Sequence, residues 1–357
     1  MEVVSNENKG QRKIYLDILN IIAIIAVVAL HCNGIVWHYS NDTAWKTSLI
    51  VEVFCYWAVP VFLMITGANL LVYYKKYDLK TYFKKRMSKI LIGFLFASIL
   101  TISYRLITNS IDINMLSFEN ILETIMYHKY EGIYYYIFVI IGVYFTIPLI
   151  APLSEEKNKK ILNYAIIIIM IMNVLIPSLV QIFDFAYNHD LLVQVGGYII
   201  YILLGYELSV CDLSKNKRMI LYIVATLMTV FKYIYTLNES ISIENYSNTL
   251  CGYANFFTVI LAAAIFVFIK NINYKKIFNN ISLTNIINKI SSYSFYVYLI
   301  HMLIVDIQIR LLEINCYSWE WRTFGVVSTY LISLIIIHMY MVVYQKIKKY
   351  LLKKFKE

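Results

Sequence analysis

Ten apolar stretches run through this chain, and each has the length of about 20 residues that a helix needs to cross the hydrocarbon core of a bilayer. Inside hydrocarbon every backbone polar group needs an internal hydrogen bond, and the stretches are too long for the strands of a barrel. The sequence therefore predicts an all-α polytopic membrane protein, a bundle of about ten transmembrane helices. The predicted spans are residues 14–35, 48–73, 89–108, 133–152, 161–180, 192–210, 219–237, 251–269, 290–312 and 323–345.

The composition agrees with this class. Hydrophobic residues make up 60% of the chain and charged residues only 15%, whereas about a quarter of a soluble globular domain is charged. The two weakest predictions are the sixth span, which ends in Gly-Tyr-Glu, and the seventh, which contains Lys232.

The basic residues define an orientation. With the N-terminus in the cytoplasm, 26 of the 32 lysine and arginine residues fall in cytoplasmic segments, and the alternation holds across all ten spans. The chain is therefore predicted to divide into a basic cytoplasmic segment (1–13), a membrane domain (14–345) and a basic cytoplasmic tail (346–357). The tail is expected to lie against anionic lipid rather than to bind nucleic acid. The net charge of +10 is therefore interpreted as a result of the membrane topology, since most of the basic residues fall in cytoplasmic segments.

Neither a cleavable signal peptide nor a soluble domain is expected, because no small-x-small cleavage site follows the first span and the segments between spans are short. The five cysteines have no metal-binding or redox spacing, so no metal is predicted. Buried thiols are favoured over an approach of Cys32 to Cys55.

The first span carries polar residues that lipid would not tolerate. Asp17, Asn20 and His31 are separated by spacings that return to the same side of a helix at about 100° per residue. Such groups are costly in hydrocarbon and usually mark a functional site, so this stripe is expected to face protein or water. Its apolar members are Ile24, Val27 and Val28.

His31 is the strongest catalytic candidate, because a neutral imidazole can act as a general base or carry an acyl group. The alternative is an interfacial histidine that contacts headgroups or water. Asp17 lies near the cytoplasmic edge, where it can also simply pair with Lys13 or with a neighbouring helix. His301 falls near the middle of the ninth span, where a site or a helix–helix hydrogen bond is favoured.

The second span adds a kink and a polar notch. Pro60 frees a backbone carbonyl, Thr66-Gly67 permits a close approach, and Asn69 follows two residues later. Beside the polar stripe of the first span, these residues predict a cavity between the two helices. Glu52, at the outer side of the same span, is a candidate acceptor-side group that solvent alone would also explain.

Four motifs follow one another along the chain. They are Asp17-x-x-Asn20-x(10)-His31, Val59-Pro-Val-Phe-Leu-Met-Ile-Thr-Gly-Ala-Asn-Leu-Leu71, Tyr144-Phe-Thr-Ile-Pro148 and Ser294-Phe-Tyr-Val-Tyr-Leu-Ile-His301. Because the membrane acyltransferase-3 family has such motifs in the same order, the chain resembles this family over nearly its whole length.

The resemblance implies a multi-pass enzyme of the bacterial plasma membrane. Such an enzyme moves an acetyl or other short acyl group from acetyl-CoA or another short acyl-CoA to hydroxyls of a cell-envelope glycan or lipid-linked sugar, with polysaccharide-biosynthesis proteins as possible partners. The family usually has Arg where this chain has Asn20, and Ser where it has Thr66. No extracellular esterase-like domain, which some members append, is recognised here.

For the donor, the resemblance and the basic segments together point to phosphate contacts on the cytoplasmic side. The candidates are Arg12, Lys13, Lys84, Lys85 and Arg86. For the acceptor, Tyr134, Tyr135 and Tyr136 offer rings for a sugar, although interfacial tyrosine belts are common.

Two other classes of protein compete with an acyltransferase. A transporter or flippase of a polysaccharide precursor also has many spans with buried polar groups, but its two related halves usually both contain broken helices. Here one span broken by proline lies early, no matching broken span appears in the second half, and the halves do not look alike. Nothing in the sequence specifically favours a sensor or scaffold.

Overall fold

The computed structural model describes residues 13–112, 117, 119–120, 123, 131–188, 192–193, 196–274 and 281–354. Within these residues the secondary structure consists of helices, with no strands. Eight helical segments are long and apolar enough to span a membrane, and two shorter apolar helices accompany them. The structure confirms the all-α prediction. The helices also match the predicted spans, except at the second, sixth and eighth spans, which are described below. The principal α-helices are α1 (Ile14–Cys32), α2 (Thr43–Cys55), α3 (Ala58–Leu70), α4 (Leu79–Ile107), α6 (Tyr135–Ile150), α7 (Lys159–Ile169), α8 (Ile176–Phe183), α9 (Ile199–Val210), α10 (Lys215–Ile243), α11 (Phe256–Lys270), α13 (Ile281–Leu312) and α14 (Val326–Lys354).

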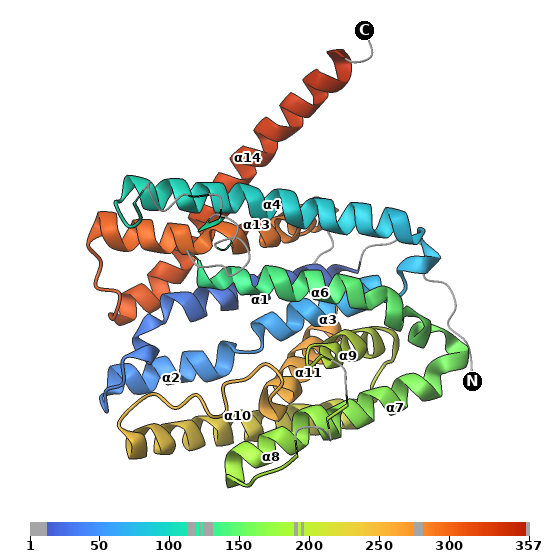
Figure 1. The fold of residues 1–357 in the computed structure, drawn as a ribbon. Helices are drawn as coiled ribbons and strands as arrows, with labels where there is room; N and C mark the ends of the chain where they lie inside the picture. Colours follow the sequence, from blue (N-terminus) through green and yellow to red (C-terminus); the bar gives the residue numbers. More distant parts are fainter. Residues whose placement is uncertain are drawn as a thin grey trace.

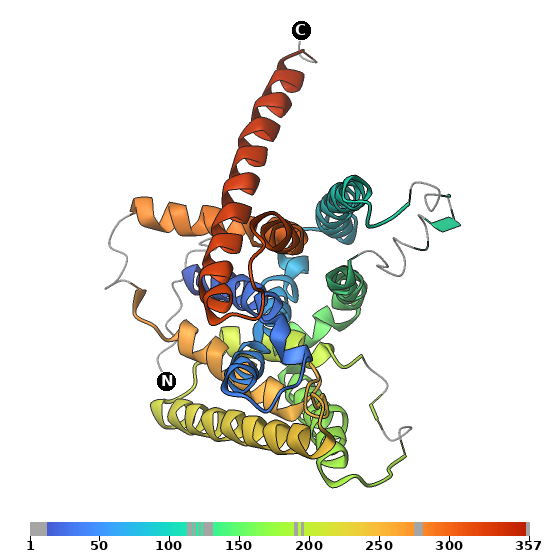
Figure 2. The same cartoon turned by 90° about the vertical axis from the view of Figure 1, so that its left-hand side faces the viewer.

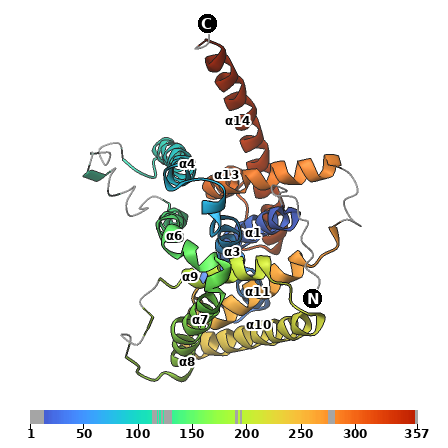
Figure 3. The same ribbon diagram turned by 90° about the vertical axis from the view of Figure 1, so that its right-hand side faces the viewer.

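Helices α1 and α3 occupy the centre of the bundle (Figure 3), with α4, α6 and α13 on one side and α9 and α11 on the other. Helix α1 packs mainly against α13 and α3. Its stripe residues Asp17, Ile24, Val27 and Val28 are all buried. The prediction that this stripe faces protein rather than lipid is therefore confirmed at these positions.

The second predicted span is not one kinked helix but two helices, α2 and α3, separated at Tyr56 and Trp57. Pro60 explains the position of the break, because it has no N–H to donate to the carbonyl of Tyr56 and its ring clashes with that carbonyl. Helix α3 begins again with a bond from the Val61 amide to the Trp57 carbonyl, 3.0 Å.

Helices α3 and α9 approach each other through two glycines. A Cβ atom on Gly67 would lie 2.0 Å from the carbonyl oxygen of Ile202, and one on Gly205 would lie 2.1 Å from that of Met64. The close approach predicted for Thr66-Gly67 is thus made to the backbone of α9.

The sixth and eighth predicted spans form shorter helices than expected. Helix α9 begins at Ile199 and α11 at Phe256, so neither has the length of a full membrane crossing. The chain before α11 is not helical between Asn245 and Asn255. Tyr246 and Cys251 in this segment nevertheless contact each other inside the bundle, 3.0 Å between Oη and Sγ.

The remaining helices form the periphery. Helices α7 and α8 are joined by a π-helical stretch, Met170–Leu175, and pack near α10 at one edge of the bundle (Figure 1). Helix α10, the seventh predicted span, is 29 residues long and exposes Ile220, Ile223 and Leu227 on its outer face. It is a full-length span despite Lys232. Helix α14 projects away from the bundle toward the C-terminus (Figure 2).

Candidate active site

Helices α1 and α13 run in the same direction side by side and are joined at two levels. At the lower level, near the start of α1, the Asn20 side-chain amide donates to the Ser291 carbonyl oxygen (2.8 Å) and to the Ser291 hydroxyl (3.1 Å). Eleven residues further along α1, the ring of His31 lies 5.1 Å from the ring of His301, tilted by 49°. At 1.5 Å per residue the two levels are about 16 Å apart.

The hydrogen bond of His301 determines which ring nitrogen carries its proton. Nδ1 lies 2.7 Å from the carbonyl oxygen of Tyr298, one turn earlier on α13. A carbonyl can only accept, so Nδ1 carries the hydrogen and the neutral ring has its lone pair on Nε2. That Nε2 is buried and has no hydrogen-bond partner among the described residues. The structure thus brings together His31 and a second histidine with an available lone pair.

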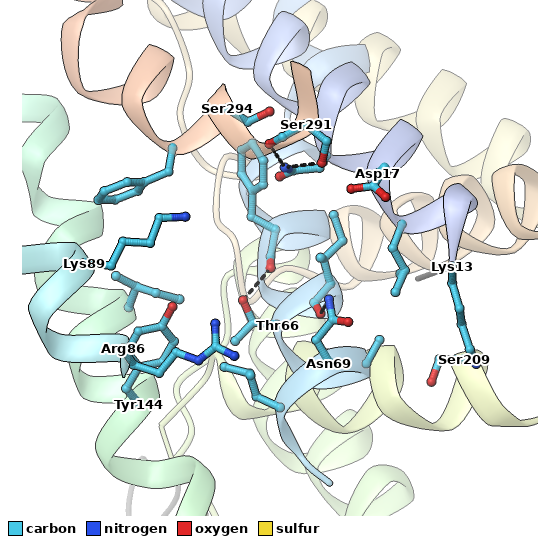
Figure 4. Close-up of a pocket in the computed structure, with 18 of the residues that line it drawn as sticks. Lys13, Asp17, Thr66, Asn69, Arg86, Lys89, Tyr144, Ser209, Ser291 and Ser294 are labelled. Atoms are coloured by element: carbon cyan, nitrogen blue, oxygen red, sulfur yellow. Dashed lines mark hydrogen bonds between the residues drawn. The ribbon is translucent and has the colours of Figure 1, made fainter. Parts of the chain in front are cut away.

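A pocket of about 930 Å³ lies beside the lower level of α1 and α13 (Figure 4). Lys13 and Asp17 lie on one side of it, Arg86 and Lys89 on the other, and Thr66 and Asn69 of α3 between them. The volume is near the upper end of the usual range for small-molecule sites. Other lining residues include Lys75, Lys76, Tyr77, Tyr136, Tyr144, Tyr206, Ser209, Ser291, Ser294 and Tyr298.

One end of this pocket is strongly basic. Five basic side chains line it, against the single carboxylate of Asp17. Arg86 donates to the Tyr77 hydroxyl (3.0 Å), while its Nε is buried without an acceptor among the described residues. Lys89 lies against the rings of Phe295 and Tyr296, 5.5 and 5.7 Å from their centroids.

Helix α4 holds these two basic residues at one edge of the pocket because its start is fixed. Asp78 is its N-cap, and the Thr81 amide donates to the Asp78 carboxylate, 3.0 Å. Hydrogen bonds from the Thr81 side chain and amide lower the pKa of the Asp78 carboxyl. Arg86 and Lys89 are three residues apart, so they project from neighbouring positions on one face.

The opposite end of the pocket leads toward the histidines. Tyr136 and Tyr298 line it, with their rings 5.4 Å apart in an edge-to-face arrangement. Ser294 also lines it, and its buried hydroxyl has no partner among the described residues. Because the Tyr298 carbonyl binds His301, the pocket ends one helical turn from the histidine pair.

The remaining predicted residues are distributed as follows. Lys84 is exposed and does not line the pocket, and Lys85 lies over the Tyr77 ring, 4.7 Å from its centroid. Gly67, expected to line a cavity, instead packs against α9, and His301 lies beyond the lining residues. Arg12 is outside the described residues.

Three consecutive tyrosines point to three different places. Tyr134 donates to the Leu299 carbonyl (3.0 Å), Tyr135 to the Tyr253 hydroxyl (3.1 Å), and Tyr136 lines the pocket. Successive helical residues are about 100° apart, so these rings do not form one platform for a sugar.

Glu52 is buried, with 3% of its surface exposed, so the expectation that solvent alone accommodates it is wrong. Its charge is coupled to that of the equally buried Lys232, which comes from α10. The Lys232 ammonium lies 4.7 Å from the centroid of the Tyr56 ring, and that ring stacks on Tyr253 at 4.8 Å. A second polar cluster is therefore built where the α2–α3 break meets the segment before α11.

Sequence reasoning missed several lining residues. From the sequence alone, Lys75, Lys76 and Lys89 indicate only topology, Tyr298 is one residue of the motif that ends at His301, and nothing singles out Ser291. Their signal was spacing, because Lys89 follows Arg86 by three residues and Tyr298 precedes His301 by three.

The comparison with protein families decides the broad identity. The model of the acyltransferase-3 family, described as an acyltransferase domain, matches residues 13–338. The chain belongs to this family. It is a membrane acyltransferase, and the acyltransferase domain includes every element of the pocket and both histidines. Comparisons with curated proteins and with solved structures found no significant match.

Proposed function

We propose that this acyltransferase moves an acetyl or another short acyl group from acyl-CoA to a hydroxyl of a cell-envelope glycan or lipid-linked sugar. The observation that carries the proposal is the 930 Å³ pocket, basic at one end and directed at its other end toward the His31–His301 pair. The proposed setting is the bacterial plasma membrane with both termini in the cytoplasm, where acyl-CoA is available.

The basic end suits the phosphates of coenzyme A. Arginine and lysine form short, charge-assisted hydrogen bonds with phosphate oxygens, and Arg86 has a buried N–H with no acceptor within the described structure. Lys13, Lys75, Lys76 and Lys89 add positive charge around the same opening. The thin pantetheine arm would then follow the α1–α13 seam, whose two contact levels are about 16 Å apart.

His31 performs the chemistry in this proposal. A neutral imidazole can take the proton of the attacking hydroxyl, or its nitrogen can carry the acyl group between donor and acceptor. A quenched reaction with labelled donor and no acceptor separates the two, because label bound covalently to His31 identifies the carrier.

Asn20 and Asp17 have different places in the proposal. Asn20 connects α1 to α13 through Ser291 and so holds the seam along which the donor lies. Asp17 borders the pocket but is about 21 Å along the helix from His31, too far to orient its ring.

The acceptor is proposed to approach from the other side of the membrane, toward the cluster around Glu52. Tyr56 belongs to this cluster through its contact with Lys232, and Tyr135 connects to it through Tyr253. A buried carboxylate among tyrosine rings suits a sugar, which offers hydroxyl donors and an apolar ring face. Proteins of polysaccharide biosynthesis are the proposed partners that deliver it.

The donor pocket is tested by charge reversal on α4. Arg86→Glu and Lys89→Glu should each weaken the binding of coenzyme A to the purified protein by at least tenfold in titration calorimetry. Lys84→Glu is the matched control, because Lys84 lies on the same helix but outside the pocket. Equal weakening by all three variants would show only a general charge effect and would remove the pocket from the proposal.

A further inference from the structure

Among the residues that the structure describes, no carboxylate is hydrogen-bonded to the pair formed by His31 and His301, although a carboxylate usually orients a working histidine. In many hydrolases and transferases a third group accepts a hydrogen bond from the far ring nitrogen of the active histidine. Asp17, the carboxylate that shares α1 with His31, is about 21 Å away along the helix axis. The ring that does lie against His31 is His301, at 5.1 Å between centroids.

His301 is prepared to accept a proton. Its Nδ1–H is bound to the Tyr298 carbonyl at 2.7 Å, which leaves the lone pair on Nε2. This nitrogen is fully buried and has no partner among the described residues. A buried acceptor that is left unsatisfied destabilises a protein, so such an atom in a native structure calls for an explanation.

We propose that His301 is a positioning residue whose Nε2 accepts the ring proton of His31 while His31 reacts. The proposal rests on the proposed acyl transfer. It assigns to a second neutral imidazole the place that a carboxylate takes in other enzymes, and it accounts for the unpartnered nitrogen.

The proton balance is the same for both chemistries of His31. As a base, one nitrogen of His31 takes the proton of the acceptor hydroxyl, the hydroxyl oxygen bonds to the acyl carbon, and the carbon–sulfur bond breaks. The proton on the other nitrogen of His31 passes to Nε2 of His301. The departing thiolate then takes up one proton, and both rings end neutral.

As an acyl carrier, His31 bonds to the acyl carbon and the thiolate leaves, while the His31 ring proton passes to Nε2 of His301 and then to the thiolate. The acceptor oxygen next displaces the nitrogen, and the hydroxyl proton returns to His31. In both cases the positive charge that develops on His31 is shared with His301, and two rings bear at lower cost a charge that would be costly on one ring in the apolar interior.

Two substitutions separate proton acceptance from simple packing. In His301→Gln the side-chain oxygen can still accept a hydrogen bond from His31 but cannot take its proton. His301→Leu removes both abilities. Both variants should lower kcat for acyl transfer by at least 100-fold, a loss within the usual contribution of acid–base groups, and leave KM for acyl-CoA within twofold.

His338→Gln is the matched control, because His338 lies on α14 outside the pocket, with its Nδ1 3.1 Å from the Tyr293 hydroxyl. It should retain the activity of the wild type. Thermal unfolding of each purified variant shows whether it is folded.

Near wild-type activity of His301→Gln would overturn proton acceptance, because a hydrogen bond alone would then suffice. If KM rose in the His301 variants while kcat and thermal stability fell, proton acceptance would also be overturned. His301 would then serve only to pack the helices. If the wild-type protein itself transfers no acyl group, the proposed function fails instead, and the two failures are thereby distinguished.

Discussion

The contact between α3 and α9 leads to a prediction whose size follows from the geometry. A methyl group on Gly67 would lie 2.0 Å from the Ile202 carbonyl oxygen, and ordinary contacts of this kind are 3.4–4 Å. In Gly67→Ala the two helices would therefore have to separate locally by about 1.4 Å. A backbone oxygen cannot rotate away as the end of a side chain can, so the neighbouring helix itself must move.

The cost of that movement can be set against the gain from replacing a helical glycine. Overpacking of a dense interior costs typically ~1–3 kcal/mol, and the rigid partner places this site near the upper value. Alanine returns ~0.5–1 kcal/mol through its better helix propensity. The net expectation is a loss of about 2 kcal/mol in the free energy of unfolding.

Equilibrium unfolding of the purified protein in mixed micelles with increasing SDS, followed by circular dichroism, measures this loss. Gly142→Ala is the control, because Gly142 lies within α6 and a Cβ there would meet nothing within 4 Å. The control should be unchanged or more stable by up to ~1 kcal/mol. If Gly67→Ala were as stable as Gly142→Ala, the close approach of α3 and α9 would be refuted.

Two further predictions use the same unfolding measurement. Asn20→Ala should lower the free energy of unfolding by about 1–2 kcal/mol, because it removes both hydrogen bonds to Ser291. The double variant Asn20→Ala/Ser291→Ala should lose less stability than the two single variants lose together. Additive costs would show that the two residues act independently. Glu52→Gln and Lys232→Met should each destabilise the protein, because each removes one of two opposite charges that are both buried and attract each other, and the double variant should recover part of that loss. A double variant that loses the full sum would show that the two charges are not coupled.

The sequence predicts the helical class and most spans because hydropathy and length determine them. The ninth predicted span also contains the ionisable residue Asp306, and its carboxylate accepts from the Tyr104 hydroxyl (2.7 Å) and from Arg310 (2.9 Å). Such a residue is expected to have partners, because an ionisable group in an apolar helix has few tolerable surroundings.

Other features depend on which side chains meet, and these were not predictable. The length of α9 and α11, the packing of Gly67 against α9 and the burial of Glu52 beside Lys232 all arise from contacts between distant segments. For the candidate site, the sequence supplied His31 and His301 separately, and Arg86 as one of three adjacent basic residues. Only the structure pairs the histidines and separates Arg86 from Lys84.

The central claim is that an acyl group reaches its acceptor by way of His31, and one measurement tests it most directly. Membranes that contain the wild-type chain or His31→Ala at equal abundance are incubated with acetyl-CoA labelled in the acetyl group, and label in envelope glycans is counted. The account predicts incorporation by the wild type and at least a 100-fold loss in His31→Ala. Equal incorporation by the two proteins would contradict it.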